Sequence, residues 1–247
     1  MNDLTGKRAL VTGGGTGVGA TIAGRLAAAG ATVTIAGRRP EPLLATAAAH
    51  PGMKSEICDV TDEGRVIDLF ERADPFDIVV ANAGNADSAP MLRTDLELWQ
   101  RTLEVNLTGV FLTFREGLKR MSDWGRLITV ASTAGLKGYG YVTSYCAAKH
   151  GVIGLVRALA LETARRPVTV NALCPGFTET PLLQKSVDNI MAKTGKSEEE
   201  ARAALAETNP QQRLIQPDEV AAAALWLCGP GSEGITGQAI SISGGET

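Results

Sequence analysis

The sequence predicts a three-layer α/β fold, a doubly wound and mostly parallel sheet of seven strands with helices on both faces. Short β-branched or apolar runs recur along the chain, and Ala- and Leu-rich stretches with helical spacing lie between them. Strands that alternate with helices form βαβ units, which build parallel sheets. The central runs are also nearly continuous in apolar residues, as expected for strands that are buried on both faces.

The predicted elements follow one another in regular alternation. The strands are expected at residues 8–12, 32–36, 54–58, 76–81, 127–131, 168–173 and 238–242. The helices are expected at residues 21–29, 65–72, 96–121, 147–163 and 220–227. No linker rich in Ser, Gly or Pro separates two halves, so we expect residues 1–247 to form one domain.

Composition narrows the class of protein. Among 247 residues, 24 Lys and Arg face 27 Asp and Glu, and 44% of the residues are hydrophobic, which are ordinary globular proportions. The near-neutral charge argues against nucleic acid as a partner. No apolar run is long enough to span a membrane, and the N-terminus lacks an apolar signal core. The four cysteines are scattered, without metal-ligand spacing, so we expect reduced thiols, a cytoplasmic location and no metal site.

Residues 178–215, here called the lid segment, interrupt the alternation. They contain a predicted helix at residues 182–193 and then Ser197-Glu198-Glu199-Glu200, a capping box that begins a second helix. A long insertion with its own helices is usually a lid or a binding element. A surface hairpin without a function is the alternative.

Glycines concentrate directly after the first predicted strand. The segment Gly13-Gly14-Gly15-Thr16-Gly17-Val18-Gly19 leads into an alanine-rich helix. Such a turn lets a pyrophosphate approach backbone N–H groups and the helix N-terminus. A triphosphate-binding loop would need Lys-Ser/Thr after the last glycine, and Ala20-Thr21 stands there instead. The turn therefore predicts a dinucleotide ligand and a Rossmann-like fold.

The end of the second predicted strand indicates which dinucleotide binds. It reads Gly37-Arg38-Arg39, without an acidic residue to hold a ribose 2′-hydroxyl. A guanidinium grips a 2′-phosphate through two hydrogen bonds. The sequence favours NADP(H), with Arg38 as the main contact and Arg39 beside it. NAD(H), with a solvated arginine pair, is the alternative.

Three residues predict acid–base chemistry. Tyr145 and Lys149 are spaced i, i+4, so they share one helix face. A lysine ammonium beside a tyrosine lowers the phenol pKa and makes the phenol a usable acid or base. Ser132 follows a predicted strand, where its hydroxyl can donate to a substrate carbonyl. The structural alternatives are a surface pair and a turn-capping serine.

Further motifs occur in a fixed order along the chain. They are Asp59-Val60 after the third strand, Asn82-Ala83-Gly84 after the fourth, Asn106 within a predicted helix, and Pro175-Gly176-Phe177-Thr178 after the sixth. Together with the glycine turn and Tyr145-x-x-x-Lys149, they resemble the short-chain dehydrogenase/reductase family in its single-domain form. The resemblance covers essentially the whole chain.

The resemblance implies a role for each site residue. Tyr145 would be the general acid/base, Lys149 would lower its pKa and hold the nicotinamide ribose, Ser132 would polarise the carbonyl, and Asn106 would order a water that links Lys149 to solvent. The implied cofactor contacts are Thr12, Gly13, Gly15, Thr16, Gly17, Val18, Gly19, Arg38, Arg39, Asp59, Val60, Asn82, Ala83, Gly84, Tyr145, Lys149, Pro175, Gly176, Thr178 and Thr180. The reaction implied is hydride transfer between the nicotinamide and a secondary alcohol or ketone without a metal, in a homotetramer or homodimer.

The substrate wall is expected at residues 85–94 and 133–141 and on the lid segment. The candidate substrate contacts are Ser132, Thr133, Tyr139, Tyr145, Phe177, Leu182 and Leu183. The apolar lid face, completed by Val187, Ile190 and Met191, suits a modestly apolar ketone or alcohol, although the same stripe could pack against the sheet.

The chain also looks similar to 3-hydroxybutyrate dehydrogenases and 3-oxoacyl-thioester reductases, which implies a 3-oxoacyl or 3-hydroxyacyl substrate. The histidine that some hydroxybutyrate enzymes carry after the serine is absent, because Ala134 and Gly135 stand there, so a small carboxylate is not expected. A cofactor-binding regulator or scaffold without turnover is the alternative function.

Overall fold

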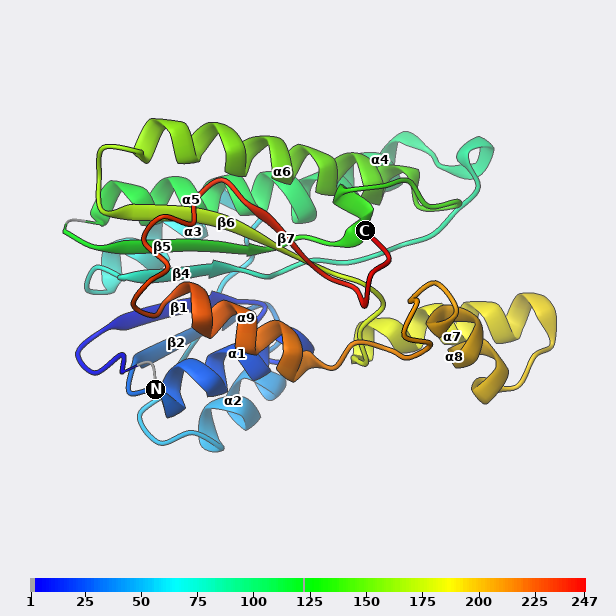
Figure 1. Ribbon diagram of the computed structural model, residues 1–247, viewed down its shortest axis with the longest axis horizontal. Helices are drawn as coiled ribbons and strands as arrows, with labels where there is room; N and C mark the ends of the chain where they lie inside the picture. Colours follow the sequence, from blue (N-terminus) through cyan, green and yellow to red (C-terminus); the bar gives the residue numbers. More distant parts are fainter. Residues whose placement is uncertain (1–2, 122) are drawn as a thin grey trace.

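The computed structural model describes residues 3–121 and 123–247, and these residues form a parallel sheet between two layers of helices (Figure 1). Within this part of the chain the sheet has seven strands in the order β3-β2-β1-β4-β5-β6-β7, all paired in parallel. The strands are β1 (Arg8–Thr12), β2 (Thr32–Gly37), β3 (Lys54–Ile57), β4 (Ile78–Ala81), β5 (Gly125–Val130), β6 (Val168–Pro175) and β7 (Ala239–Ile242). The predicted fold class is confirmed.

The helices cover both faces of the sheet (Figure 1). One layer holds α3 (Glu63–Arg72), α4 (Leu96–Leu103), α5 (Gly109–Arg120) and α6 (Thr143–Thr163). The other layer holds α1 (Gly17–Ala28), α2 (Pro40–Ala48) and α9 (Pro217–Leu227). Across the described residues, no helix combines the length and apolar character needed to cross a membrane.

Alternate residues of the central strands fill two separate cores. In β5, Leu127 packs with Phe70 and Phe114 in the core beneath α3, α5 and α6. Its neighbour Ile128 packs with Ile22 in the core beneath α1 and α9. Successive side chains of a strand point to opposite faces, so a strand covered on both sides must be apolar throughout.

The helix predicted at residues 96–121 is interrupted. It ends as α4 at Leu103, widens into a π-helical turn over Glu104–Thr108, and continues as α5 from Gly109. Such turns occur frequently at functional sites. The sequence prediction also lacked α2, whose start is marked by Pro40, since proline is favourable in the first turn of a helix.

The lid segment carries α7 (Pro181–Thr194) and α8 (Glu198–Ala206), which project away from the sheet (Figure 1). The predicted capping box of Ser197 and Glu200 is confirmed. Leu183 and Val187 of α7 pack with Ala201 and Leu205 of α8 in a small third core. The apolar stripe of α7 therefore packs largely against α8, and not against the sheet, because the two lid helices need an apolar interface of their own.

Two buried valines test whether the lid core is energetically separate from the sheet. Val170 in β6 and Val187 in α7 are both fully buried. We expect Val170→Ala to lower the free energy of unfolding by about 2 kcal/mol, because it leaves a cavity in the main core. Val187→Ala should lower it by less than half as much while accelerating proteolysis within residues 179–216. Urea unfolding and limited proteolysis measure both effects, and equal global losses would contradict the separation.

Candidate active site

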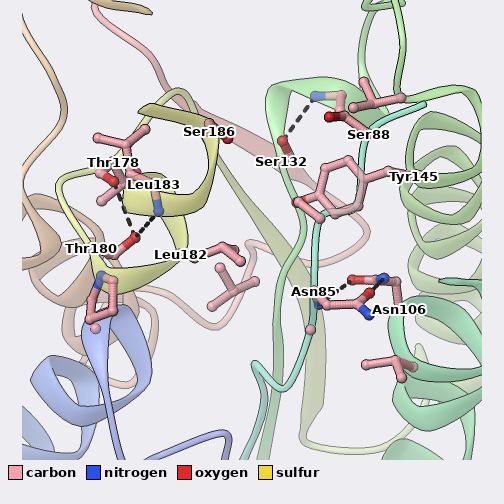
Figure 2. A pocket seen from close by; sticks show the side chains of 18 of the residues that line it. Asn85, Ser88, Asn106, Ser132, Tyr145, Thr178, Thr180, Leu182, Leu183 and Ser186 are labelled. Carbon is pink, nitrogen blue, oxygen red and sulfur yellow. Dashed lines mark hydrogen bonds between the residues drawn. The ribbon is translucent and has the colours of Figure 1, made fainter. Parts of the chain in front are cut away.

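A cavity of about 1260 Å³ opens at the carboxyl ends of the strands. Parallel α/β sheets bind ligands at this edge, where the strand order changes direction between β1 and β4. Figure 2 shows two facing walls, with Thr178, Thr180, Leu182, Leu183 and Ser186 on the lid side and Ser132, Tyr145, Asn85 and Asn106 on the other.

Nearly all the predicted site residues line this cavity. Those of the predicted cofactor and catalytic sets on its wall are Gly13, Gly15, Thr16, Gly17, Val18, Arg38, Arg39, Asp59, Val60, Asn82, Ala83, Gly84, Asn106, Ser132, Tyr145, Lys149, Pro175, Gly176, Thr178 and Thr180. The predicted substrate contacts Thr133, Tyr139, Phe177, Leu182 and Leu183 line it as well. The folded chain thus brings together residues that lie as far apart as positions 13 and 183.

The glycine turn presents an open helix N-terminus to the cavity. In α1 no side chain caps the first N–H groups, and the first turn holds no acidic residue. Free N–H groups and the helix dipole favour an anion at such a terminus. Gly13 and Gly17 have positive φ of 66° and 55°, a conformation that side chains disfavour. The residues present therefore fit the pyrophosphate of a dinucleotide.

Two predicted cofactor contacts, Thr12 and Gly19, do not line the cavity. The Thr12 hydroxyl accepts hydrogen bonds from the backbone of Asn82 (3.1 Å) and Ala83 (3.2 Å). A side chain at Gly19 would clash with the Asn82 amide and with the Gly13 carbonyl. These two residues shape the turn from behind, because close packing between strand and helix leaves them no access to a ligand.

The Asn82 amide also supports the glycine turn. It donates to the carbonyls of Thr12 (3.0 Å) and Gly13 (3.2 Å), so it joins the end of β4 to the turn after β1.

At the far end of the cavity Arg38 and Asp59 face each other. Arg38 Nη1 lies 3.8 Å from Asp59 Oδ2, and the Arg38 side chain is largely exposed. Asp59 Oδ1 accepts from the backbone N–H and the hydroxyl of Thr61, which fixes the carboxylate. The Arg38 guanidinium thus stays accessible to an anionic group.

Ser132, Tyr145 and Lys149 converge on one wall. Ser132 Oγ accepts from the Ala134 N–H at 3.1 Å, so it caps the short 3₁₀ turn Thr133–Gly135, and its side chain lines the cavity together with Tyr145. Lys149 is buried, and its Nζ donates to the Val130 carbonyl at 2.9 Å and lies 5.5 Å from the centre of the Tyr145 ring. The capping role of Ser132 is confirmed, and the residue also lines the cavity.

The pKa values differ from the sequence prediction. Burial raises the pKa of Tyr145 to about 12, and the Ser132 side chain acts in the opposite, lowering direction. Burial also lowers the pKa of Lys149 to about 8. The expectation that Lys149 lowers the pKa of Tyr145 is wrong for the protein alone, since loss of hydration disfavours the charged form of both groups. The ammonium is also engaged by Val130.

Asn106 is fully buried inside the π-helical turn. Its amide donates to Asn85 Oδ1 (2.8 Å) and to the Thr102 carbonyl (3.0 Å), and its Oδ1 accepts from the Asn85 N–H (3.3 Å). A Cβ on Gly84 would come within 2.8 Å of Asn106 Oδ1 and 3.8 Å of Lys149 Nζ. The bare backbone of Gly84 thus lies between the two side chains.

On the lid side, Thr180 caps α7, and its hydroxyl donates to the Thr178 carbonyl at 3.2 Å. A Cβ on Gly17 would lie 3.2 Å from the Thr180 methyl, so the start of the lid segment rests on the glycine turn. Phe177 meets Tyr139 edge to face, with ring centres 6.1 Å apart. Aromatic edges and leucines make this end of the cavity mainly apolar.

Several wall residues were not predicted. They are Gly37, Pro42, Leu43, Cys58, Val105, Val130, Ala131 and Val142. Pro42 and Leu43 belong to the missed helix α2, and the proline pair Pro40 and Pro42 was the signal that could have revealed it. No group of His, Cys, Asp and Glu suited to a metal occurs among residues 3–121 and 123–247.

The buried ammonium of Lys149 makes stability depend on pH. Its folded pKa lies near 8 and below the usual 10.5, so the unfolded chain binds more protons between these values. The wild type therefore gains stability as pH rises through this window and loses it as pH falls. Relative to Lys149→Met, the gain from pH 8 to 10.5 should be about 3 kcal/mol. Urea unfolding across this range measures it, with exposed Lys185→Met as control; a flat difference would contradict the lowered pKa.

Comparisons with known proteins assign the family. The family model described as enoyl-(acyl carrier protein) reductase matches residues 13–247. The chain is 37% identical to a 3-oxoacyl-acyl-carrier-protein reductase of Aquifex aeolicus and 36% identical to a D-beta-hydroxybutyrate dehydrogenase of Cupriavidus necator, with 98% of each chain covered. A crystal structure of an actinorhodin polyketide ketoreductase variant with NADPH aligns with a TM-score of 0.92 and 36% identity, covering 100% of this chain and 99% of that one. The chain belongs to the short-chain dehydrogenase/reductase family, a family of nicotinamide-dependent oxidoreductases.

Proposed function

We propose that this oxidoreductase interconverts a secondary alcohol and a ketone, with Ser132, Tyr145 and Lys149 at the reacting end of the cavity and NADP(H) as the preferred cofactor. The convergence of these three side chains on one wall, opposite the open N-terminus of α1, carries the proposal. A regulator that only binds a cofactor has no need of a tyrosine that shares the cavity wall with a serine and a buried ammonium.

Each residue has a distinct task. The Ser132 hydroxyl orients the substrate oxygen through a hydrogen bond, because its proton can donate while its oxygen accepts from the Ala134 N–H. Tyr145 gives or takes the proton at its phenol oxygen. Lys149 places a positive charge behind the phenol, held by the Val130 carbonyl. When bound, the nicotinamide cofactor would supply the hydride chemistry.

The lining supports a modestly apolar substrate. Phe177, Leu182 and Leu183 face the serine wall, and Ile190 extends the apolar surface along α7. A 3-oxoacyl or 3-hydroxyacyl compound fits this combination of one polar reacting end and an apolar wall, and two of the relatives are named for such substrates.

Assembly as a homotetramer, or a homodimer, is part of the proposal. The exposed apolar residues Phe111 of α5 and Leu161 of α6 support it, since both lie on the helical layer expected to pair.

Replacement of Tyr145 tests the chemistry. Tyr145→Phe removes the proton donor and should lower kcat by about 10³-fold or more, while cofactor affinity changes little. Reduction of ketones followed by absorbance of the reduced cofactor, with cofactor binding by fluorescence titration, measures both. Exposed Tyr141→Phe is the matched control. Substantial turnover by Tyr145→Phe, or cofactor binding without turnover by the wild type across a broad ketone panel, would favour the regulator instead.

Replacement of Arg38 tests cofactor choice. Arg38→Ala removes a charged contact to the 2′-phosphate and should weaken NADPH binding by roughly 10- to 100-fold, with little effect on NADH. Binding constants for both cofactors measure this selectivity. Arg65→Ala, which removes an exposed arginine of α3 that does not line the cavity, is the control. Equal losses for NADPH and NADH would contradict a 2′-phosphate contact.

A further inference from the structure

A buried carboxylate lies directly behind the substrate wall and belongs to none of the predicted sites. The side chain of Glu246, next to the last residue of the chain, is only 2% exposed. Gly244 and Gly245 both have positive φ, of 64° and 97°, and this double turn bends the chain end back toward the sheet. The C-terminus consequently lies beside the segment that links β5 to α6 (Figure 1).

The contacts of Glu246 reach the cavity wall. Its Oε1 accepts from the Tyr139 hydroxyl at 2.5 Å and lies 3.0 Å from Lys137 Nζ. Its Oε2 has no hydrogen-bond partner and faces Gly176, where an added Cβ would lie 3.3 Å away. Tyr139 and Gly176 both line the cavity. The carboxylate is therefore one residue removed from the space where the substrate lies.

The hydroxyls of Tyr139 and Thr133 carry one proton each, and this fixes the direction of their hydrogen bonds. A tyrosine hydroxyl has one proton, and a carboxylate can only accept, so the Tyr139 proton is committed to Glu246. The Tyr139 oxygen is 2.6 Å from Thr133 Oγ1, and it must then accept the Thr133 proton. Thr133 follows Ser132 directly and also lines the cavity. Both hydroxyls thus direct their protons along the hydrogen bonds that end at Glu246, and Tyr139 and Thr133 can offer a substrate only acceptors.

The negative charge of Glu246 is only partly neutralised by the positive charge of Lys137. Glu246 is 2% exposed, whereas the side chain of its partner Lys137 is 41% exposed. Solvent screens the exposed ammonium far more than the buried carboxylate, so the field inside the cavity is dominated by the negative charge. A carboxylate with an unpartnered oxygen is costly to bury, which calls for a role beyond packing.

We propose that Glu246 is a specificity-determining residue that disfavours substrates with a carboxylate beside the reacting ketone and favours neutral ketones, esters and thioesters. The proposal rests on the function proposed above. The positive charge of Lys137 weakens this preference for neutral substrates, so removal of Glu246 and removal of Lys137 should change the preference in opposite directions.

Two probes of the same carbon skeleton test the selection: acetoacetate, which carries the carboxylate, and its neutral methyl ester. The measured quantity is the ratio of kcat/KM for the ester to that for the acid. Glu246→Gln leaves the positive charge of Lys137 without its negative partner and should lower the ratio about tenfold. Lys137→Gln leaves the negative charge of Glu246 without its positive partner and should raise the ratio several-fold. The double variant should fall between them.

The opposite signs separate electrostatics from damage to the fold, because a merely structural role would shift the ratio the same way for both variants. Glu233→Gln is the matched control, since Glu233 is exposed in the loop before β7, at the opposite end of the sheet, and should leave the ratio unchanged. An unchanged ratio, or equal shifts, in Glu246→Gln and Lys137→Gln would overturn the proposal.

If the wild type reduces neither probe, the ketone panel described above decides whether the proposed function holds, and the selection is read from binding. Titration calorimetry of acetoacetate and its methyl ester then gives the same comparison without turnover. Opposite shifts of the binding preference in the two variants would support the selection, and their absence would overturn it.

Discussion

The close approach of two strand ends governs the rest of this structure. The turn after β1 and the end of β4 meet where the strand order reverses, and the Asn82 amide ties them by donating to the carbonyls of Thr12 and Gly13. A side chain at Gly13 or Gly19 would clash with that amide. Because the turn is held without side chains, the N-terminus of α1 stays open to an anion, and the lid segment can rest on it at Gly17 and Thr180.

On the wall opposite the N-terminus of α1, burial changes the pKa values of Tyr145 and Lys149 and makes their charged forms costly. The ammonium of Lys149 and the phenol of Tyr145 are both placed where hydration is lost, so each pKa moves toward the neutral form. The main core and the hydrogen bond from Lys149 to Val130 stabilise this arrangement. The lid helices pack on each other through Val187 and Leu205, so they present Leu182 to the cavity without being part of the sheet core.

Local sequence patterns predicted the elements that depend on neighbours in the chain. The strand runs, the capping box at Ser197 and the Tyr145–Lys149 spacing each follow from a period or a short motif. The π-helical turn at residues 104–108 could not be predicted from a local pattern. Asn106 hydrogen-bonds there to Asn85 and Thr102, and of these two only Thr102 lies on the preceding helix. The helix α2 was missed because its alanines and prolines give only a weak apolar period.

The sequence by itself determined the α/β fold, the family and most of the residues that line the cavity, since these depend on periodicity and on ordered motifs. The tertiary structure alone decided which residues support the site from behind, as Thr12 and Gly19 do, and in which direction burial moves the pKa of Tyr145. It also brought Glu246 against Tyr139, two residues 107 positions apart. Burial and long-range contacts are properties of the packed chain, and no local pattern encodes them.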